Sequence, residues 1–298
     1  MRIPFDKRQV GTVLLLALMV LSAPLGARAA PGGSGDYRFE RIGESEGLSP
    51  DVITRLYRDH RGMIWVGTRE GLFVYDGYSA QRIVNDPDNP ASISGNSIRA
   101  IFRDSGGRMW FGTNTGGLCR LEPGSSEFAC TKADAANPNG LSHDSVYAVV
   151  EDQDGSIWVG TQDGLNRIDP TAGRVRRVPF SARHPDGPGQ EYVTALLVDR
   201  AGDLWVGTVG RGVFVRRRGD DSFTHFGDSA GYGDPSGFSF LEDSNGNLWA
   251  GGATAVLRKR RGEDQFETLS LLGRSEDDAP SVTTMVETAN GKILAGTF

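Results

Sequence analysis

Four polar side chains that could bind a ligand recur at nearly equivalent places in this sequence, each shortly after a tryptophan. They are Arg69, Asn114, Gln162 and Arg211. Amide and guanidinium groups donate several hydrogen bonds, and a guanidinium can hold a carboxylate through two parallel bonds. If the fold brings these residues to one face, they form a ring suited to a polar or anionic ligand. The alternative is that they are ordinary solvated loop residues.

Residue types for catalysis or metal binding do not gather in the same way. Neighbouring carboxylates such as Glu151 and Asp152 would point to opposite faces of a strand, so they do not make an acid/base pair. The run from Asp152 to Gly155 resembles the start of a calcium loop but lacks the remaining ligands. No two histidines have metal-site spacing; they are His60, His143, His184 and His225. We therefore expect no catalytic residue, no metal and no cofactor.

The tryptophans define the elements that must position the polar residues. All five lie in the motif Gly-x-(aliphatic or Met)-Trp-x-Gly, at Trp65, Trp110, Trp158, Trp205 and Trp249. A sixth copy has Leu294 in the tryptophan position. Successive tryptophans are 44 to 48 residues apart, which is the length of four short strands with their turns.

An aspartate precedes each tryptophan by six residues, and a glycine follows that aspartate by three. These aspartates are Asp59, Asp104, Asp152, Asp199 and Asp243. Such a pair is typical of a tight turn, in which the carboxylate caps backbone N–H groups and glycine takes the left-handed conformation. A strand-like run such as Ile53-x-x-Leu56-Tyr57 comes before the turn, and Gly-rich turns separate two further strands after the tryptophan.

The repeat predicts an all-β fold, a β-propeller of four-stranded antiparallel blades with about five full blades and part of a sixth. Stacked blades bury their faces against each other, and we expect the tryptophans to fill these interfaces. A sugar-stacking role for the tryptophans is the alternative. The predicted domain is 31–298, with blades at about 47–84, 92–131, 140–179, 190–227, 234–270 and 280–298, and 37–42 as a possible closing outer strand. Since the last blade is partial, we expect the natural protein to continue.

The first thirty residues have the layout of a secretory signal peptide. Arg2, Lys7 and Arg8 are followed by an apolar run from Val10 to Leu21 and by small residues around Arg28. We predict a signal peptide at 1–30, with an uncleaved N-terminal anchor as the alternative, and a periplasmic location.

Because the net charge is −6 and Lys/Arg clusters are short, we do not expect nucleic acid as a partner.

The only two cysteines, Cys119 and Cys130, flank a turn-like segment from Glu122 to Ser126. If this segment is a hairpin, the two residues lie nearly opposite each other, and an oxidising compartment would permit a cross-strand disulfide. An unbonded pair is the alternative, and a two-cysteine metal site is disfavoured because no histidine lies nearby in the sequence.

The repeated motifs resemble the two-component regulator propeller repeat. They read Gly47-Leu48-Ser49, Ile53-x-x-Leu56, Asp59-x-x-Gly62-x-Ile64-Trp65-Val66-Gly67-Thr68 and Gly71-Leu72. The resemblance covers about residues 37 to 298. The fifth unit departs most, since Gly251-Gly252 replaces Gly-Thr and Gly237 replaces the first aliphatic residue.

The resemblance implies the periplasmic sensor of a membrane-bound regulator, anchored through a segment beyond this chain and working as a dimer. It implies a histidine kinase or diguanylate cyclase as the output domain, and a glycan or other polar nutrient as the ligand. An exported propeller enzyme, such as a lyase or glycan hydrolase, is the alternative, because propellers host both functions.

Overall fold

The computed structural model describes residues 42–48, 52–134, 136–137, 139–178, 192–226, 236–269 and 281–297. The predicted signal peptide, most of the predicted closing strand and His184 lie outside these residues. A short 3-10 helix, η1 (Glu44–Glu46), precedes the strands. Within the described parts of the chain, no helix is long and apolar enough to cross a membrane.

The described strands form six antiparallel sheets, each built from strands that are consecutive in the chain. We number the sheets as blades 1 to 6. Blade 1 contains β1 (Ile53–Arg58), β2 (Ile64–Thr68), β3 (Leu72–Tyr75) and β4 (Ala80–Ile83). Blade 2 contains β5 (Ile98–Arg103), β6 (Met109–Thr113), β7 (Leu118–Leu121) and β8 (Phe128–Thr131). Blade 3 contains β9 (Val146–Glu151), β10 (Ile157–Thr161), β11 (Gly164–Ile168) and β12 (Val175–Val178).

The second half repeats this order. Blade 4 contains β13 (Val193–Val198), β14 (Leu204–Thr208), β15 (Val213–Arg216) and β16 (Thr224–Phe226). Blade 5 contains β17 (Gly237–Glu242), β18 (Leu248–Gly252), β19 (Val256–Lys259) and β20 (Glu267–Leu269). In blade 6 the described strands are β21 (Val282–Glu287) and β22 (Ile293–Thr297).

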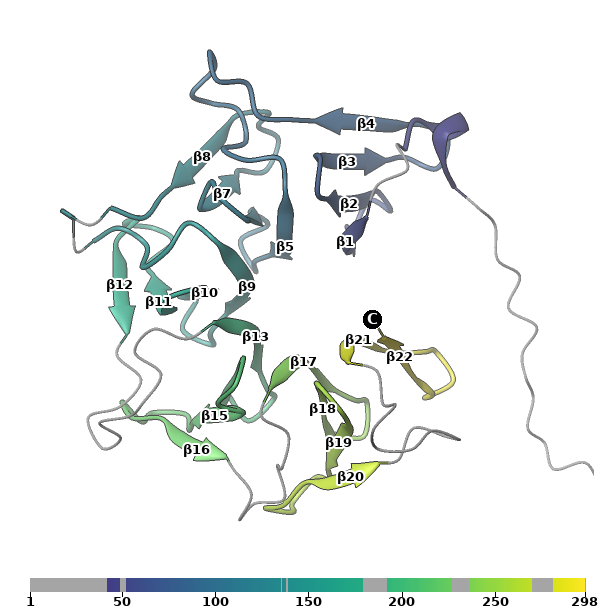
Figure 1. The fold of residues 1–298 in the computed structure, drawn as a ribbon, viewed down its shortest axis with the longest axis vertical. Helices are drawn as coiled ribbons and strands as arrows, with labels where there is room; N and C mark the ends of the chain where they lie inside the picture. Colours follow the sequence, from purple (N-terminus) through teal and green to yellow (C-terminus); the bar gives the residue numbers. More distant parts are fainter. Residues whose placement is uncertain are drawn as a thin grey trace, which may run out of the picture. The chain divides into compact units, whose positions relative to one another are not determined.

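The blades are arranged radially. Their first strands, β1, β5, β9, β13, β17 and β21, face a common centre, while β4, β8, β12, β16 and β20 lie at the periphery (Figure 1). Each first strand contacts that of the next blade, and all six line one cavity. The predicted β-propeller is confirmed.

An aspartate holds the indole of the tryptophan in each of the first five blades. The indole Nε1–H donates to aspartate Oδ2 at 3.3, 2.8, 2.9, 2.8 and 2.9 Å in blades 1 to 5. The other carboxylate oxygen accepts a backbone N–H of the turn, from Asp203 to Asp199 in blade 4, for example, at 2.9 Å. The glycine three residues after the aspartate has a positive φ in all of them. One carboxylate therefore caps the turn and satisfies the indole.

Blade 6 has neither the aspartate nor the tryptophan of this hydrogen bond. Thr288 stands where the other blades have aspartate, and Leu294 stands where they have tryptophan. The Thr288 hydroxyl still accepts the backbone N–H of Lys292, at 3.0 Å. The turn is thus retained without the indole bond.

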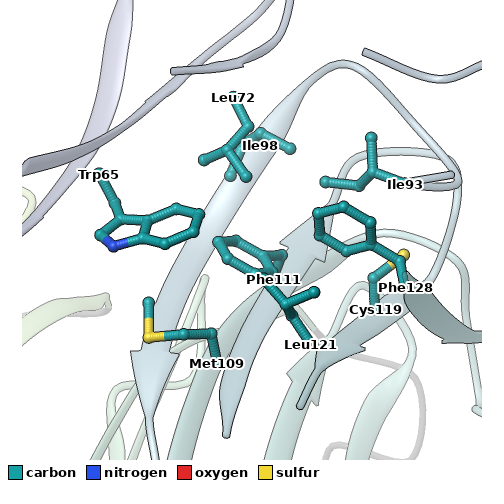
Figure 2. Packing of buried hydrophobic residues seen from close by; sticks show 9 residues of the cluster. All are labelled: Trp65, Leu72, Ile93, Ile98, Met109, Phe111, Cys119, Leu121 and Phe128. Carbon is teal, nitrogen blue, oxygen red and sulfur yellow. The ribbon is translucent and has the colours of Figure 1, made fainter. Parts of the chain in front are cut away.

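The tryptophan of each blade packs against the next blade. Trp65 of blade 1 lies in one apolar cluster with Ile98 and Phe111 of blade 2 (Figure 2), and its ring centroid is 5.4 Å from that of Phe111. The other four tryptophans bridge their blades in the same way. Their side chains thereby form the interblade core.

The glycine two residues after the tryptophan lets the next blade come close. A Cβ on Gly160 would lie 2.5 Å from Cγ1 and 2.8 Å from the carbonyl oxygen of Val193 in blade 4. These distances are too short for any carbon contact, so the repeated glycine is required by the approach of the next inner strand.

Glutamates tie neighbouring blades together at the turn end. The Glu151 carboxylate of blade 3 accepts the backbone N–H of Ser105 at 2.7 Å and its hydroxyl at 2.6 Å. Glu287 holds Ser244 in the same way, at 2.7 and 2.6 Å, and Glu242 accepts the N–H of Arg200 at 2.8 Å. These bonds fix three blade junctions in register.

Cys119 and Cys130 are joined by a disulfide. They are directly opposite each other on β7 and β8, with their Cα atoms 4.0 Å apart. The bond crosslinks the outer hairpin of blade 2.

We predict that Gly160→Ala lowers the free energy of unfolding by about 1 to 3 kcal/mol, because the added methyl overpacks the junction of blades 3 and 4. Chemical denaturation measures this loss. Gly106→Ala is the control, since the nearest atoms to its methyl would be side-chain atoms at more ordinary distances, Arg108 Nη2 at 3.2 Å and Asp104 Oδ1 at 3.3 Å. Equal losses in the two variants would contradict the close-approach argument.

We also predict that Asp243 contributes to acid sensitivity. Burial raises the pKa of Asp243, but hydrogen bonds from Trp249, Asn247 and Asn245 outweigh it and leave the pKa below its ordinary value. A carboxyl group with a lowered folded-state pKa stabilises the fold above its unfolded pKa, near 3.9. This stabilisation is lost as the pH falls through the folded pKa. Asp243→Asn should therefore flatten the fall of Tm below about pH 4.

The matched control for the acid experiment is Asp264→Asn, which changes an exposed aspartate between β19 and β20. Its melting profile should follow that of the wild-type protein. A wild-type slope in Asp243→Asn would show that the indole-bonded carboxylate does not drive acid unfolding.

Candidate ligand-binding site

Every inner strand carries a β-bulge at the same place. The second residue of the strand has no partner on the neighbouring strand, so the register shifts by one. The six bulged residues are Thr54, Arg99, Tyr147, Thr194, Phe238 and Thr283. Bulges redirect side chains and are common beside functional sites. This position is threonine in blades 1, 4 and 6 but arginine, tyrosine and phenylalanine in blades 2, 3 and 5, whereas the residues that pack between blades repeat.

The inner strands enclose a cavity of about 460 Å³. Five of the bulged residues line it, and so do the residues that follow the bulges. The residue after the bulge is small in blades 2 to 6, but in blade 1 it is Arg55. Among the described side chains that line the cavity, Arg55 is the only charged one.

A second arginine and two tyrosines follow Arg55 in the successive blades around the centre. Arg99 of blade 2 lies with its Cζ 5.9 Å from the ring centroid of Tyr147 in blade 3. Tyr147 stacks on Tyr192, which precedes blade 4, with centroids 6.0 Å apart and an interplanar angle of 18°. Tyr192 remains 41% exposed. We call Arg55, Arg99, Tyr147 and Tyr192 the arginine–tyrosine cluster.

The charges of this cluster are not compensated within the described chain. No carboxylate of the described residues lies within ion-pair distance of Arg55 or Arg99. Arg55 donates to the carbonyl oxygen of Thr54 at 2.8 Å, and the buried Nε of Arg99 has no hydrogen-bond partner there. Burial and then repulsion from Arg99 lower the pKa of the Arg55 guanidinium. The cavity is therefore positively charged.

The residues predicted from the sequence lie at the same end of the blades as the bulges, because the start of β1 pairs with the end of β2. Arg69 and Arg211 are exposed, while Asn114 and Gln162 are half-buried. Their role in ligand binding remains a prediction.

Arg211 does not occupy the position equivalent to the other three. The N–H groups of Asn114 and Gln162 donate to the carbonyl oxygens of Ser97 and Ser145. In blade 4 the same bond runs from Val209 to the carbonyl oxygen of Tyr192. Arg211 lies two residues further on, and its carbonyl oxygen is 2.9 Å from His225 Nε2. Turn length does not explain this offset, because the turn of blade 2, closed by Thr113 N–H on the carbonyl oxygen of Gly117, is as long as that of blade 4. Counted from the tryptophan, the residue of blade 4 that corresponds to Asn114 and Gln162 is Val209.

Several other charged or titratable groups of the described chain are engaged in local bonds. Arg216 pairs with Asp152 at 2.7 Å, and Arg167 pairs with Asp154. His143 accepts the N–H of Ser145 at 2.9 Å. The described residues contain no group of three potential metal ligands.

The fold and its repeated motifs define the class of the protein, a β-propeller. Four segments match the family described as two component regulator propeller, at residues 47–70, 92–115, 140–163 and 187–210. The chain therefore contains repeats of this family, and the resemblance predicted from its motifs is confirmed.

The chain is similar to part of several larger proteins. "Histidine kinase P4" of Formosa agariphila is 29% identical over 87 residues, which is 29% of this chain and 6% of that protein. The extracellular domain of the putative hybrid two component system BT3049 from B. thetaiotaomicron has a TM-score of 0.73 and 20% identity. The match covers 87% of this chain and 34% of that domain. The chain thus spans about a third of the solved domain.

An enzyme has a related fold. Virginiamycin B lyase from Staphylococcus aureus has a TM-score of 0.57 and 14% identity, over 82% of this chain and 83% of the lyase. At such identities the likeness shows the fold alone, so the functional class has to be argued from the site.

Proposed function

We propose that this chain is the extracytoplasmic ligand-sensing propeller of a bacterial signal-transduction receptor. One observation carries the proposal: residues that differ between the blades, among them Arg55, Tyr147 and Phe238, line one central cavity. Repeated residues build the frame, so the variable ones are free to select a ligand. We propose a polar small molecule or an oligosaccharide as that ligand, with signalling through a C-terminal output domain.

Several features support a periplasmic location and attachment to the inner membrane. The similar solved domain is an extracellular domain of a two component system. The Cys119–Cys130 disulfide suits an oxidising compartment, and the first thirty residues have the layout of a signal peptide. We propose attachment through a C-terminal segment or an uncleaved N-terminal anchor, and dimerisation in the full-length receptor.

An exported lyase or glycan hydrolase is the second candidate, because the lyase named above shares the fold. The cavity itself favours binding. Most glycosidases act through a pair of carboxylic side chains, whereas the described side chains around this cavity are apolar or carry hydroxyl and guanidinium groups. We therefore propose that the chain performs no catalysis.

Incubating the purified protein with a panel of neutral and acidic oligosaccharides tests this choice. Calorimetry should detect binding to at least one of them, and chromatography should find every saccharide intact. Cleavage products above those of a protein-free control would establish the enzyme instead. Binding to no member of the panel would reject a saccharide sensor.

The polar residues predicted from the sequence, Arg69, Asn114, Gln162 and Arg211, form the predicted rim of the site. Arg69→Ala combined with Arg211→Ala should weaken binding of the saccharide identified in that panel, since two hydrogen-bonding cations are lost. The Tm should not change, because both side chains are exposed. Arg174→Ala combined with Arg176→Ala removes the same charge from the exposed outer side of blade 3 and should bind normally. Unchanged affinity in the rim variant would remove these two residues from the site.

A further inference from the structure

We infer that the arginine–tyrosine cluster binds the acidic group of an anionic saccharide, with its carboxylate or sulfate held by Arg55 and Arg99. This inference rests on the proposed sensing function and names the class of its ligand. The cluster joins residues from four successive parts of the ring, so it exists only in the folded propeller.

The first argument is the missing counter-charge. Elsewhere in the described chain most half-buried arginines meet a carboxylate, as in Arg108–Asp104 at 2.6 Å and Arg216–Asp152 at 2.7 Å. Arg55 lines the cavity, Arg99 lies on the adjacent inner strand β5, and the described lining contains no carboxylate. Burying unpaired like charges is unfavourable. An anion between them would offset that cost and accept hydrogen bonds from both guanidinium groups.

The second argument is the aromatic surface beside the arginines. Tyr147 and Tyr192 stack on each other, and Tyr192 keeps 41% of its surface exposed. An exposed tyrosine ring offers an apolar face and a hydroxyl group to the same ligand. A sugar ring has apolar C–H faces and hydroxyl edges, so it matches this surface while its acidic substituent reaches the arginines.

The third argument is position and size. Arg55 projects from the one inner strand whose residue after the bulge is large, and it lies in a cavity of about 460 Å³. Small-molecule sites commonly have volumes of about 300 to 1,000 Å³. The cavity therefore suits a small acidic saccharide.

Calorimetry with simple acidic sugars tests the inference on the whole protein. Glucuronate and galacturonate should bind, and their neutral counterparts glucose and galactose should bind at least tenfold more weakly. Inorganic sulfate provides the anion without a ring. Because the attraction is electrostatic, affinity for the acids should fall as sodium chloride is raised. If neither acid binds the wild-type protein, or if the neutral sugars bind equally well, the inference is wrong.

Variants then assign the binding to the cluster. Arg55→Gln and Arg99→Gln should each weaken binding of the acids at least tenfold. Tyr192→Ala should weaken binding of the sugars more than binding of sulfate. Arg174→Gln, which removes an exposed arginine of blade 3, should bind like the wild type. Full affinity in both Arg55→Gln and Arg99→Gln would overturn the assignment.

Stability distinguishes a binding role from a structural one. If the arginines are kept for a ligand, either glutamine variant should melt, without ligand, at or above the wild-type Tm. A clear fall in Tm in both variants would mark the arginines as structural and contradict the inference. A saccharide that binds independently of both arginines would leave the sensing function in place and reject only the anionic site.

Discussion

The structure depends on one carboxylate in each of the first five blades. The tryptophan that fills the blade interface carries one polar group, and an indole N–H buried without an acceptor costs about 1 to 3 kcal/mol. The aspartate six residues earlier satisfies it and caps the preceding turn at the same time. This bond fixes the indole against the neighbouring blade and the turn between the first two strands. Where the tryptophan is replaced by Leu294, the aspartate is replaced as well, by Thr288.

The repeated contacts also determine where the sequence is free to vary. Each inner strand must pair with its own blade and approach the glycine of the previous one, as Val193 approaches Gly160. The bulged residue has no partner in the ladder of its own blade. Two of the bulged threonines still bond to the next inner strand, as Thr194 does to the carbonyl oxygen of Gly237 at 2.8 Å, so the position is free to vary mainly where it is not threonine. Five of the six bulged residues line one cavity. A rigid frame of repeats can thus carry a site without symmetry, which is what recognition of a particular ligand requires.

Most of the frame could be predicted from the sequence, because its signals are local and recur. The strands, the turn with its aspartate and glycine, and the interblade tryptophans all follow from one motif read several times. The opposition of Cys119 and Cys130 follows from a short hairpin. The constant spacing of six residues between aspartate and tryptophan is consistent with a bond between them. The distance and direction of that bond depend on the conformation of the intervening turn.

The cluster at the cavity could not be predicted in this way. Arg55, Arg99 and Tyr147 come from three different blades, and their proximity depends on a bulge that moves one residue of each strand out of register. A sequence alignment of the blades shows only that this column varies. Arg211 is a different case, since counting from the tryptophan places Val209, and not Arg211, at the position of Asn114 and Gln162. Bulge register carries the information that motif spacing lacks.

Hydrogen exchange of the tryptophan indoles, followed by NMR, tests the role of the aspartates most directly. The account predicts that the N–H groups of the buried indoles, Trp65, Trp110, Trp158 and Trp205, exchange far more slowly than an exposed indole. Asp199→Ala should accelerate the exchange of Trp205 more than that of Trp65. Exchange of all these groups at the rate of free tryptophan, or an Asp199→Ala variant with unchanged protection at Trp205, would contradict it.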